Sequence, residues 1–356
     1  MRSGNDCIIG LPTIVRKLLL LFQSMLEDAA NAQLNWIGDA DTVRLWPEEV
    51  AEAPEDRDTP MPSSFGNVLN HLAVDREEAI KKYHSLFDTQ VAPSFAEETK
   101  VLELLHRPDI VEIFVPSEWR GINGIEPLEL NIREGRKHVI AKPRPVNPKI
   151  YENAYQEFLR LQKYMLRPSK SVYASPVVIA PKSTPPYIRL CGDFQEANKF
   201  LYSGYQHIPH VKHCLQKIIR YAMFLDLDMS NSFHQILLGQ LTSAYLSMST
   251  PWGQYEPVYM PEGISPAIGI LQKIVEEIFS DYEEWMIVIF DNFLVLCNSY
   301  EDAYNKLVLV LKRCKERNIV LKFSKSFLGF DTANFFGYLC RHNRYEITKD
   351  RRGKIG

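Results

Sequence analysis

Two apolar segments each enclose an acidic residue, and this pattern constrains the fold more than any other feature of the chain. The first is MFLDLDMSNSFHQI, at positions 223–236, and the second is WMIVIFDNFLVL, at positions 285–296. Both are rich in apolar residues and are typical of buried strands. Burying an unpaired charge is costly, so stability alone does not explain carboxylates at these positions. We therefore predict that Asp228 and Asp291 meet in space around a cation, most simply a divalent metal.

Length and charge limit what the whole molecule can be. Its 356 residues suffice for two ordinary domains, or for one large domain with an N-terminal extension. The formal net charge of -3 gives no global attraction to nucleic acid, so a phosphate-binding surface must be local. The six cysteines are scattered without a C-x-x-C pair, which argues against a zinc ribbon and a disulfide framework. We expect reduced core thiols.

The most apolar early segment does not have the pattern of a membrane span. IIGLPTIVRKLLLLF, at positions 8–22, is interrupted by Arg16 and Lys17 and is too short an apolar run to cross a bilayer. The order of its parts does not suit a signal peptide. We therefore expect an intracellular protein, cytoplasmic or nuclear, without a membrane partner.

The N-terminal third divides into three segments by composition. Residues 1–37 are predicted to form a short strand and a helix. They are either an isolated packing helix or a protease remnant, because DCIIGLP resembles the last strand of a retropepsin-type protease. No Asp-Thr-Gly or Asp-Ser-Gly occurs, so such a remnant would lack peptidase activity. Residues 38–66 are acidic and proline-rich, which indicates a disordered linker. Residues 67–132 are expected to form an extension of helices with a short strand.

Positive charge gathers in the segment REGRKHVIAKPRPVNPK, at positions 133–149. It includes Lys142 and Arg144, and it is either a phosphate contact or a solvated basic loop. Further along, HIPHVKHCLQKII at positions 207–219 spaces its histidines compatibly with a metal site on a helix. Its apolar stripe favours the other interpretation, an amphipathic helix with the histidines facing solvent.

Two apolar strands, at 175–183 and 187–194, surround a proline-rich turn and predict a hairpin. Lys182 lies at its tip and Arg189 on its second strand. A lysine acts as a point charge and an arginine as a planar fork, so the pair suits a triphosphate.

The order of these motifs resembles that of a known polymerase family. From about residue 142 to residue 340 the chain is similar to the reverse transcriptase of gypsy-type LTR retrotransposons, which shares its fold with retroviral polymerases. The matching segments are RPSKSVYASPVVIAPK, IRLCGDFQEANK, FLDLDMSNSFHQI, GQYEPVYMPEGISPA, IVIFDNFLVL, LKFSKSFLG and FFGY. The resemblance implies an α+β right-hand polymerase fold, with an antiparallel palm sheet packed on helices. It puts the fingers at 133–220, the palm with its primer-grip hairpin at 221–345 and a polar tail at 346–356.

The resemblance also implies a metal-dependent catalytic site. Asp228 falls on the metal-binding aspartate of the first palm strand, and Asp291 on the first aspartate of the paired-aspartate turn. With the backbone carbonyl of Met229 they would hold two Mg²⁺ ions, or Mn²⁺, because such ions favour oxygen ligands. The ions would activate the primer 3′-hydroxyl and bind the leaving pyrophosphate. Asn292, at the second position of the turn, completes the expected catalytic set.

Substrate-binding roles follow from the same resemblance. Lys182 and Arg189 match the fingers residues that hold the incoming triphosphate, and Gln272 is expected near the dNTP. Phe233 matches the aromatic gate that crowds a ribose 2′-hydroxyl, the alternative being an ordinary core phenylalanine. The residues expected to contact template or primer are Gly263, Gly337, Arg144 and Lys142.

Some residues depart from the family pattern. Asn292 replaces the second aspartate of the turn, and its neutral amide offers a metal only the carbonyl oxygen. Negative-strand RNA virus polymerases carry Gly-Asp-Asn at the comparable turn, so the replacement does not imply an inactive enzyme. Asp226 lies on the same strand face as Asp228 and is a candidate for the missing charge. Glu262 stands where an apolar or amide residue is common, and is interpreted as a neutral substitution on the template side.

These expectations define a leading function and an alternative. The leading function is the RNA-directed DNA polymerase domain of a retrotransposon polyprotein, which adds dNTPs to a primer on an RNA or DNA template. Little chain follows Tyr338, so we expect a truncated thumb and weak synthesis. Other polyprotein segments (RNase H and integrase) or a second subunit would then be partners. The alternative is a catalytically impaired nucleic-acid-binding or assembly remnant of a decayed element.

Overall fold

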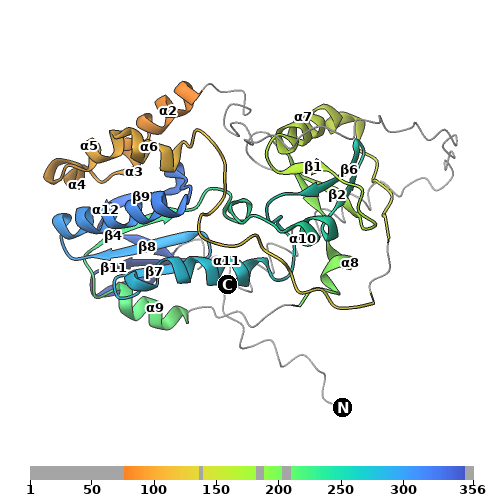
Figure 1. The fold of residues 1–356 in the computed structure, drawn as a ribbon. Coiled ribbons are helices and arrows are strands. Elements are labelled where there is room, and N and C mark those ends of the chain that lie inside the picture. Colours follow the sequence, from red (N-terminus) through yellow and green to blue (C-terminus); the bar gives the residue numbers. More distant parts are fainter. Residues whose placement is uncertain (1–75, 136–138, 182–187, 203–209, 349–356) are drawn as a thin grey trace, which may run out of the picture.

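A computed structural model of the chain describes residues 76–135, 139–181, 188–202 and 210–348. Within these residues the chain forms three β-sheets with helices packed around them, and the sheets lie in two groups (Figure 1). The segments expected at 1–37 and 38–66 lie outside the described residues. The domain boundaries expected from the sequence stay predictions.

The sheet at the left of Figure 1, here called the palm sheet, is antiparallel with the strand order β7-β8-β4-β9. Its strands are β4 (Met223–Asp228), β7 (Met286–Ile289), β8 (Asn292–Cys297) and β9 (Phe327–Phe330). Both predicted acidic segments therefore contribute strands to one sheet. β4 pairs with β8 from Met223 opposite Cys297 to Asp228 opposite Asn292. This register brings the acidic end of β4 beside the turn between β7 and β8.

One layer of elements covers each face of the palm sheet. The elements are α9 (Val211–Ile218), α11 (Ala267–Ile278), α12 (Tyr300–Arg317), β10 (Ala333–Phe335), β11 (Tyr338–Arg341) and β12 (Arg344–Ile347). Leu225 and Leu227 of β4 belong to the larger core cluster, together with residues of α11 and α12. Phe224 belongs to a second cluster, together with α9 and the sheet β10-β11-β12. Side chains alternate along a strand, so Asp226 and Asp228 lie on the Phe224 face.

Helix α12 carries the apolar stripe that its sequence predicts. Leu307 and Leu311 are fully buried in the core. The helix begins after Ser299, whose side chain accepts a hydrogen bond from the first turn. It ends at Asn318, which has a φ of 54° and terminates the helix in the left-handed conformation.

Short helices from the N-terminal side cover α12 and β9 (Figure 1). They are α2 (Arg76–Ser85), α3 (Phe87–Gln90), α4 (Pro93–Glu98), α5 (Val101–His106) and α6 (Pro108–Phe114). Phe95 of α4 is fully buried against β9. Gly329 of β9 has a φ of +77°, and a Cβ atom there would lie 2.3 Å from the Phe95 ring. Only glycine fits this position, and it lets the N-terminal helices pack closely on the palm sheet.

A second sheet, the fingers sheet, lies at the right of Figure 1 with the strand order β1-β6-β5-β2-β3. Its strands and helices are β1 (Leu166–Pro168), β2 (Ser175–Pro181), β3 (Ile188–Gly192), β5 (Met248–Thr250), β6 (Gly253–Pro257), α7 (Tyr151–Gln162) and α8 (Gln195–Asn198). β2 and β3 form the predicted antiparallel hairpin. The ring of Phe158 in α7 stacks on Trp252 with centroids 4.7 Å apart, which holds α7 against the sheet.

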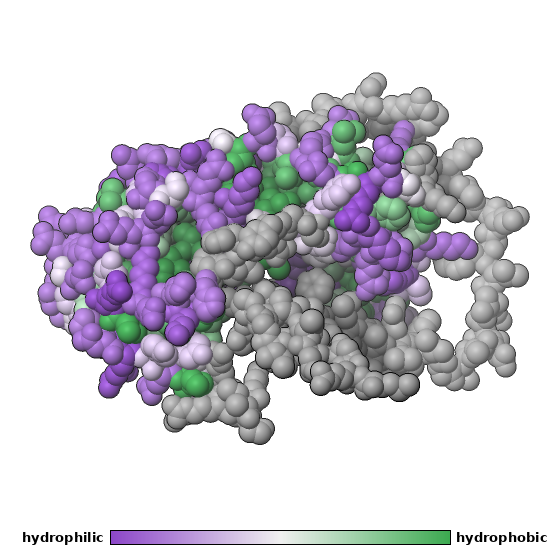
Figure 2. All heavy atoms as spheres, turned by 90° about the horizontal axis from the view of Figure 1, so that it is seen from below, coloured by the Kyte–Doolittle hydropathy of each residue, from purple (hydrophilic) through white to green (hydrophobic). Residues whose placement is uncertain are grey.

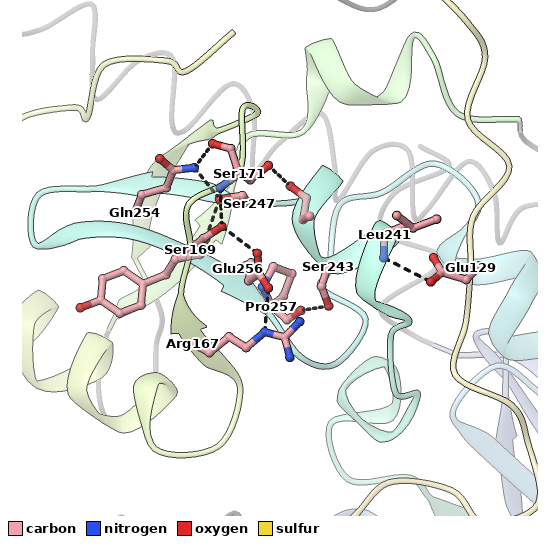
Figure 3. A network of polar contacts seen from close by, with 12 residues as sticks. Glu129, Arg167, Ser169, Ser171, Leu241, Ser243, Ser247, Gln254, Glu256 and Pro257 are labelled. Carbon is pink, nitrogen blue, oxygen red and sulfur yellow. Dashed lines mark hydrogen bonds and ion pairs between the residues drawn. The ribbon is translucent and has the colours of Figure 1, made fainter. Parts of the chain in front are cut away.

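Side-chain hydrogen bonds tie the fingers sheet to neighbouring segments (Figure 3). Glu256 of β6 accepts hydrogen bonds from Arg167, opposite it on β1, and from Ser169, both at 2.7 Å. Glu129 accepts from two backbone N–H groups at the start of α10 (Gln240–Tyr245). A carboxylate there satisfies donors that have no partner inside the helix. Glu129 thus fixes the connecting segment that approaches the fingers.

The short strand expected within residues 67–132 differs in the structure. Leu128 and Ile132 form isolated bridges instead of a strand, because each is paired with a neighbour at a single residue only. Near the end of the described residues, β10 and β11 are joined by a tight turn. Phe336 and Gly337 have φ values of 50° and 77°, and these positive values turn the chain back on itself.

Hydrophilic side chains cover most of the palm side seen in Figure 2, and apolar side chains gather in smaller areas between them. Exposed apolar residues such as Leu241 of α10 are ordinary on folded proteins. In the described part of the chain, no helix has the length and apolar character needed to cross a membrane.

Candidate active site

The acidic segments meet at one end of the palm sheet. Asp228 is the last residue of β4 and lies opposite Asn292, the first residue of β8. The backbone N–H of Met229 donates to the carbonyl oxygen of Asp291 at 2.6 Å. The expected catalytic residues are therefore close neighbours, held by backbone pairing across the strands that carry them.

The carboxylate of Asp228 is buried and only half satisfied. Its Oδ2 accepts a hydrogen bond from Nζ of Lys325 at 3.2 Å. Its Oδ1 is buried and has no hydrogen-bond partner among the described residues. Burial raises the pKa of Asp228 to about 6, with Lys325 opposing the rise and Asp291 adding to it. Such an oxygen is costly to bury, and a neighbouring cation would remove that cost.

The carboxylate of Asp226 accepts a hydrogen bond from the side chain of Asn292. The Nδ2 of Asn292 donates to Oδ1 of Asp226 at 2.7 Å. Burial raises the pKa of Asp226 to about 6, the hydrogen bond from Asn292 lowers it and Asp228 raises it. The amide nitrogen faces Asp226, so the carbonyl oxygen of Asn292 is free to face another group. That Asp226 supplies the missing charge stays a prediction.

The oxygens at this end of the sheet suit a hard divalent cation. Asp228 and Asp291 provide carboxylates, Asn292 provides an amide carbonyl, and the orphaned Oδ1 of Asp228 has no competing donor among the described residues. Mg²⁺ favours oxygen ligands of this kind and completes its octahedron with water or phosphate. Among the residues that the structure describes, no group of three or more His, Cys, Asp or Glu side chains is arranged around a metal position. The acidic set is thus smaller than three carboxylates.

The histidines predicted from 207–219 belong to an amphipathic helix in the described part of that segment. His210 caps α9, its Nδ1 lying 3.3 Å from the N–H of Lys212. Cys214 and Ile218 point into the second core cluster. His207 lies outside the described residues.

Gln272 of α11 supports the turn that carries Asp291. Its Oε1 accepts from the N–H of Phe290 at 2.7 Å, and its Nε2 donates to the carbonyl of Val288 at 2.9 Å. Phe290 has a φ of 55°, which a phenylalanine adopts only when its surroundings enforce it. Gln272 therefore holds a strained turn in place. Its predicted contact with the dNTP stays a prediction.

Arg189 lies beside a cavity of about 110 Å³. The cavity is lined by α7, β2 and β3, and also by Asn231 and Glu262. The Nη1 of Arg189 lies 2.8 Å from Oε2 of Glu262 in an ion pair. The carboxylate of Glu262 therefore occupies the predicted triphosphate ligand, and the interpretation of Glu262 as a neutral substitution stays a prediction. Lys182, the predicted second ligand, lies outside the described residues.

Phe233 belongs to a 3₁₀ turn, Ser232–Gln235, directly after Asp228. Its ring is half-buried and packs on the main core, and the gate role stays a prediction. Gln235 is fully buried and anchors this turn. Its Nε2 donates to the carbonyls of Ser230 and Val320, and its Oε1 accepts from the N–H of Val320.

Residues 136–340, which include the fingers sheet and the strands around Asp228, match the family described as reverse transcriptase (RNA-dependent DNA polymerase). The chain is a member of this family. The resemblance found in the sequence motifs is confirmed.

The relatives of this reverse transcriptase include longer polyproteins. The retrovirus-related Pol polyprotein from transposon opus of Drosophila melanogaster is 28% identical over 203 residues, covering 55% of this chain and 20% of its own length. The enzymatic polyprotein of cauliflower mosaic virus (strain Strasbourg) is 24% identical over 277 residues, covering 76% of this chain and 39% of its own length. The chain thus spans less than half the length of either relative.

Solved structures confirm the fold class. The prototype foamy virus protease-reverse transcriptase matches with a TM-score of 0.64 and 19% identity, over 75% of this chain and 35% of its own. The foamy viral protein in complex with an RNA/DNA hybrid matches with a TM-score of 0.65 and 18% identity, over 78% and 37%. The α+β arrangement of fingers and palm predicted from the sequence is the fold of these polymerases.

The residues expected to contact template or primer are dispersed over this reverse transcriptase. Gly263 has a φ of +93°, and Gly337 lies in the turn between β10 and β11. Arg144 forms an ion pair with Asp193 at 2.6 Å, and Lys142 is exposed. Their roles in nucleic-acid binding stay predictions.

Three contributors to the site were missed in the sequence. Lys325 lies within the matching segment LKFSKSFLG, and its place in that segment was the only available signal. The only sequence signal for Gln235 was its own amide side chain, which stands next to an apolar run. The pairing of Glu262 with Arg189 had no local signal, because the two residues are 73 positions apart.

Proposed function

We propose that this chain is the polymerase part of an RNA-directed DNA polymerase, transferring a nucleotide from a dNTP to a primer 3′-hydroxyl. The observation that carries the proposal is the half-satisfied carboxylate of Asp228. It lies beside Asp291 and Asn292 in a member of the reverse transcriptase family. Stability does not favour that arrangement, whereas binding of a cation does.

Asp228, Asp291, the carbonyl of Met229 and the amide oxygen of Asn292 are the residues that would hold Mg²⁺ or Mn²⁺. The bound metal would lower the pKa of the primer hydroxyl and neutralise charge on the departing pyrophosphate. Lys325 compensates the charge of Asp228 in the metal-free protein, because its ammonium contacts Oδ2. Gln272 contributes by positioning the turn that carries Asp291.

The fingers and the first palm turn would select the nucleotide. Arg189 would bind the triphosphate through its planar guanidinium, together with Lys182. The ring of Phe233 would crowd a ribose 2′-hydroxyl. Gly263, Gly337, Arg144 and Lys142 would contact the template–primer.

The substrates and partners follow from the relatives. The foamy viral protein has been solved with an RNA/DNA hybrid and with dsDNA, which supports a template–primer duplex as the substrate here. The relatives from opus and cauliflower mosaic virus are polyproteins, so further polyprotein segments are the expected partners.

Primer extension on an RNA template tests the proposal directly. The protein should incorporate dNTPs with Mg²⁺ or Mn²⁺, and Asp228→Asn should lower incorporation by more than about 100-fold because a metal ligand is lost. Asp331→Asn is the matched control, because Asp331 is an exposed aspartate in the turn after β9. It should retain activity.

Two other outcomes would contradict the proposal. Equal incorporation by wild type and Asp228→Asn would show that synthesis does not depend on this site. Salt-dependent template–primer binding without any incorporation, with either metal and with the downstream polyprotein segment added, would favour the nucleic-acid-binding alternative.

A further inference from the structure

The charges that line the cavity beside Arg189 are already paired. Arg189 and Glu262 are joined by one hydrogen bond at 2.8 Å, and their side chains are 41% and 43% exposed. Deeper in the cavity, Arg160 binds Glu157 through two hydrogen bonds, at 2.6 and 2.7 Å. The two arginines and two glutamates that line the cavity therefore cancel in formal charge.

The deeper pair is not available to a ligand. The side chains of Arg160 and Glu157 are only 19% and 5% exposed, and Arg160 also donates to the hydroxyl of Tyr164. Opening this pair would leave a buried carboxylate without compensation, which is strongly destabilising. His234, also at the cavity, adds no charge, because burial lowers its pKa to about 3. An anionic ligand can therefore recruit only Arg189 from the described lining.

The outer pair is easily opened, because exposed ion pairs with one hydrogen bond contribute little to stability. Glu262 is nevertheless held in place by its loop. The side chain of Asn198 donates to the carbonyl of Gly263 at 2.9 Å and accepts from the N–H of Ser265 at 2.9 Å. The glutamate thus stays close to Arg189 after the pair opens, and its charge continues to act on whatever binds there.

We propose that Glu262 gates Arg189, because its carboxylate competes with every anionic ligand for the guanidinium and sets a threshold for binding. It occupies the guanidinium in the free protein and repels any anion that takes its place. Only a ligand with several negative charges, such as a triphosphate, gains enough from Arg189 to displace it. The inference rests on the proposed function, because that function makes a nucleoside triphosphate the ligand of Arg189.

Binding of inorganic tripolyphosphate to the full chain, without metal or nucleic acid, tests this gate by calorimetry. Glu262→Gln should bind about 3- to 10-fold more tightly than wild type, because it removes both the competitor and the repulsion. Orthophosphate should gain no more than tripolyphosphate, because both anions open the same pair and the repulsion that is removed grows with the charge of the ligand. Glu196→Gln is the matched control. It removes a carboxylate from another exposed pair of the fingers, with Lys199, and should bind as wild type does.

A double-mutant cycle identifies the group through which Glu262 acts. The gain from Glu262→Gln should vanish when Arg189 is replaced by Gln. The gate is refuted if Glu262→Gln binds tripolyphosphate no better than wild type, or if the gain persists without Arg189.

Primer extension separates this inference from the proposed function. In an active enzyme, Glu262→Gln should lower the KM for dNTPs by a similar factor while kcat changes less than about 2-fold. A change in kcat alone would overturn the gate. If Glu262→Gln binds tripolyphosphate more tightly than wild type but neither protein has polymerase activity, the gate is supported and only the proposed function is contradicted.

Discussion

Asn292 and Asp226 are diagonal neighbours on one face of the palm sheet. Asp226 lies opposite Leu294, and Asn292 is two residues before Leu294, so Asn292 is a diagonal neighbour of Asp226 on the same face. A carboxylate only accepts hydrogen bonds, and the amide nitrogen of Asn292 must therefore face Asp226. Asp226 in this way orients the amide and leaves its carbonyl oxygen for another ligand. The orientation of Asn292 depends on the identity of residue 226.

Exchanging the two side chains tests this dependence. At pH 8, Asn292→Asp alone should lower the free energy of unfolding by about 1 kcal/mol or more, because two carboxylates would lie within hydrogen-bond distance. The same replacement in an Asp226→Asn background should change the free energy of unfolding little, because the hydrogen bond re-forms with donor and acceptor exchanged. Urea unfolding of the metal-free proteins measures both effects.

The loss of unfolding free energy caused by Asn292→Asp should also depend on pH. The carboxylate pair created by Asn292→Asp has one pKa raised by repulsion, so the folded protein binds a proton more readily than the unfolded chain. The cost is then largest above that raised pKa and shrinks as the pH falls below it. Equal costs in both backgrounds at every pH would contradict the coupling.

The turn between β7 and β8 is an element whose shape depends on a neighbouring helix. Two residues, Phe290 and Asp291, connect Ile289 to Asn292, and Phe290 has positive φ. This conformation costs energy for a phenylalanine, and the strain persists only where other contacts enforce it. Gln272 of α11 supplies such contacts from a position that is 2% exposed. Helix α11 therefore takes part in placing Asp291.

Replacing Gln272 by Leu should destabilise the protein by about 1–3 kcal/mol, because the buried N–H of Phe290 loses its acceptor. Amide hydrogen exchange at Phe290 should become faster, since that N–H is no longer protected. Glu276→Ala is the control, because Glu276 accepts a hydrogen bond from Gln272 and is not the acceptor for the N–H of Phe290. Unchanged protection at Phe290 in the Leu variant would show that the turn keeps its shape unaided.

At the scale of the whole molecule, the N-terminal helices and the palm share one core. The family match begins at residue 136, whereas the main core cluster begins at Tyr83 and continues through β4 and α12. Phe95 is central to this contact, because its ring fills the space left by Gly329. The N-terminal helices are therefore part of the same folded unit as the palm sheet, and Phe95 covers Gly329 of β9.

Phe95→Ala should lower the free energy of unfolding by about 3–5 kcal/mol, because it leaves a cavity in the core. Phe327→Ala is the matched control on β9 itself. Phe327 is 44% exposed, and its removal should cost less than about 1 kcal/mol. Chemical denaturation of both variants checks the difference. Similar costs would mean that the helices contribute little to the stability of the palm.

The parts of the site that could be predicted are those encoded locally. Asp228 and Asp291 were recognisable because each interrupts an apolar segment of the sequence, and the β2–β3 hairpin because its strands are adjacent in sequence. Lys325 and Glu262 were not assigned as partners, because their contacts join residues 97 and 73 positions apart. Such contacts depend on how finished elements approach one another. The bridges at Leu128 and Ile132 were mistaken for a strand for the same reason, since a strand needs a partner along its length.

The order of strands in the two sheets has a consequence for how the chain is made. β1 of the fingers pairs with β6, and β4 of the palm lies between them in the sequence. On a ribosome the fingers sheet remains incomplete until β6 has emerged, and β4 remains unpaired until β8 and then β9 have emerged. Chains grow by about 5–20 residues per second, so this apolar strand stays unpaired for seconds. The strand that carries Asp228 is thus exposed to chaperones and to misassembly during translation.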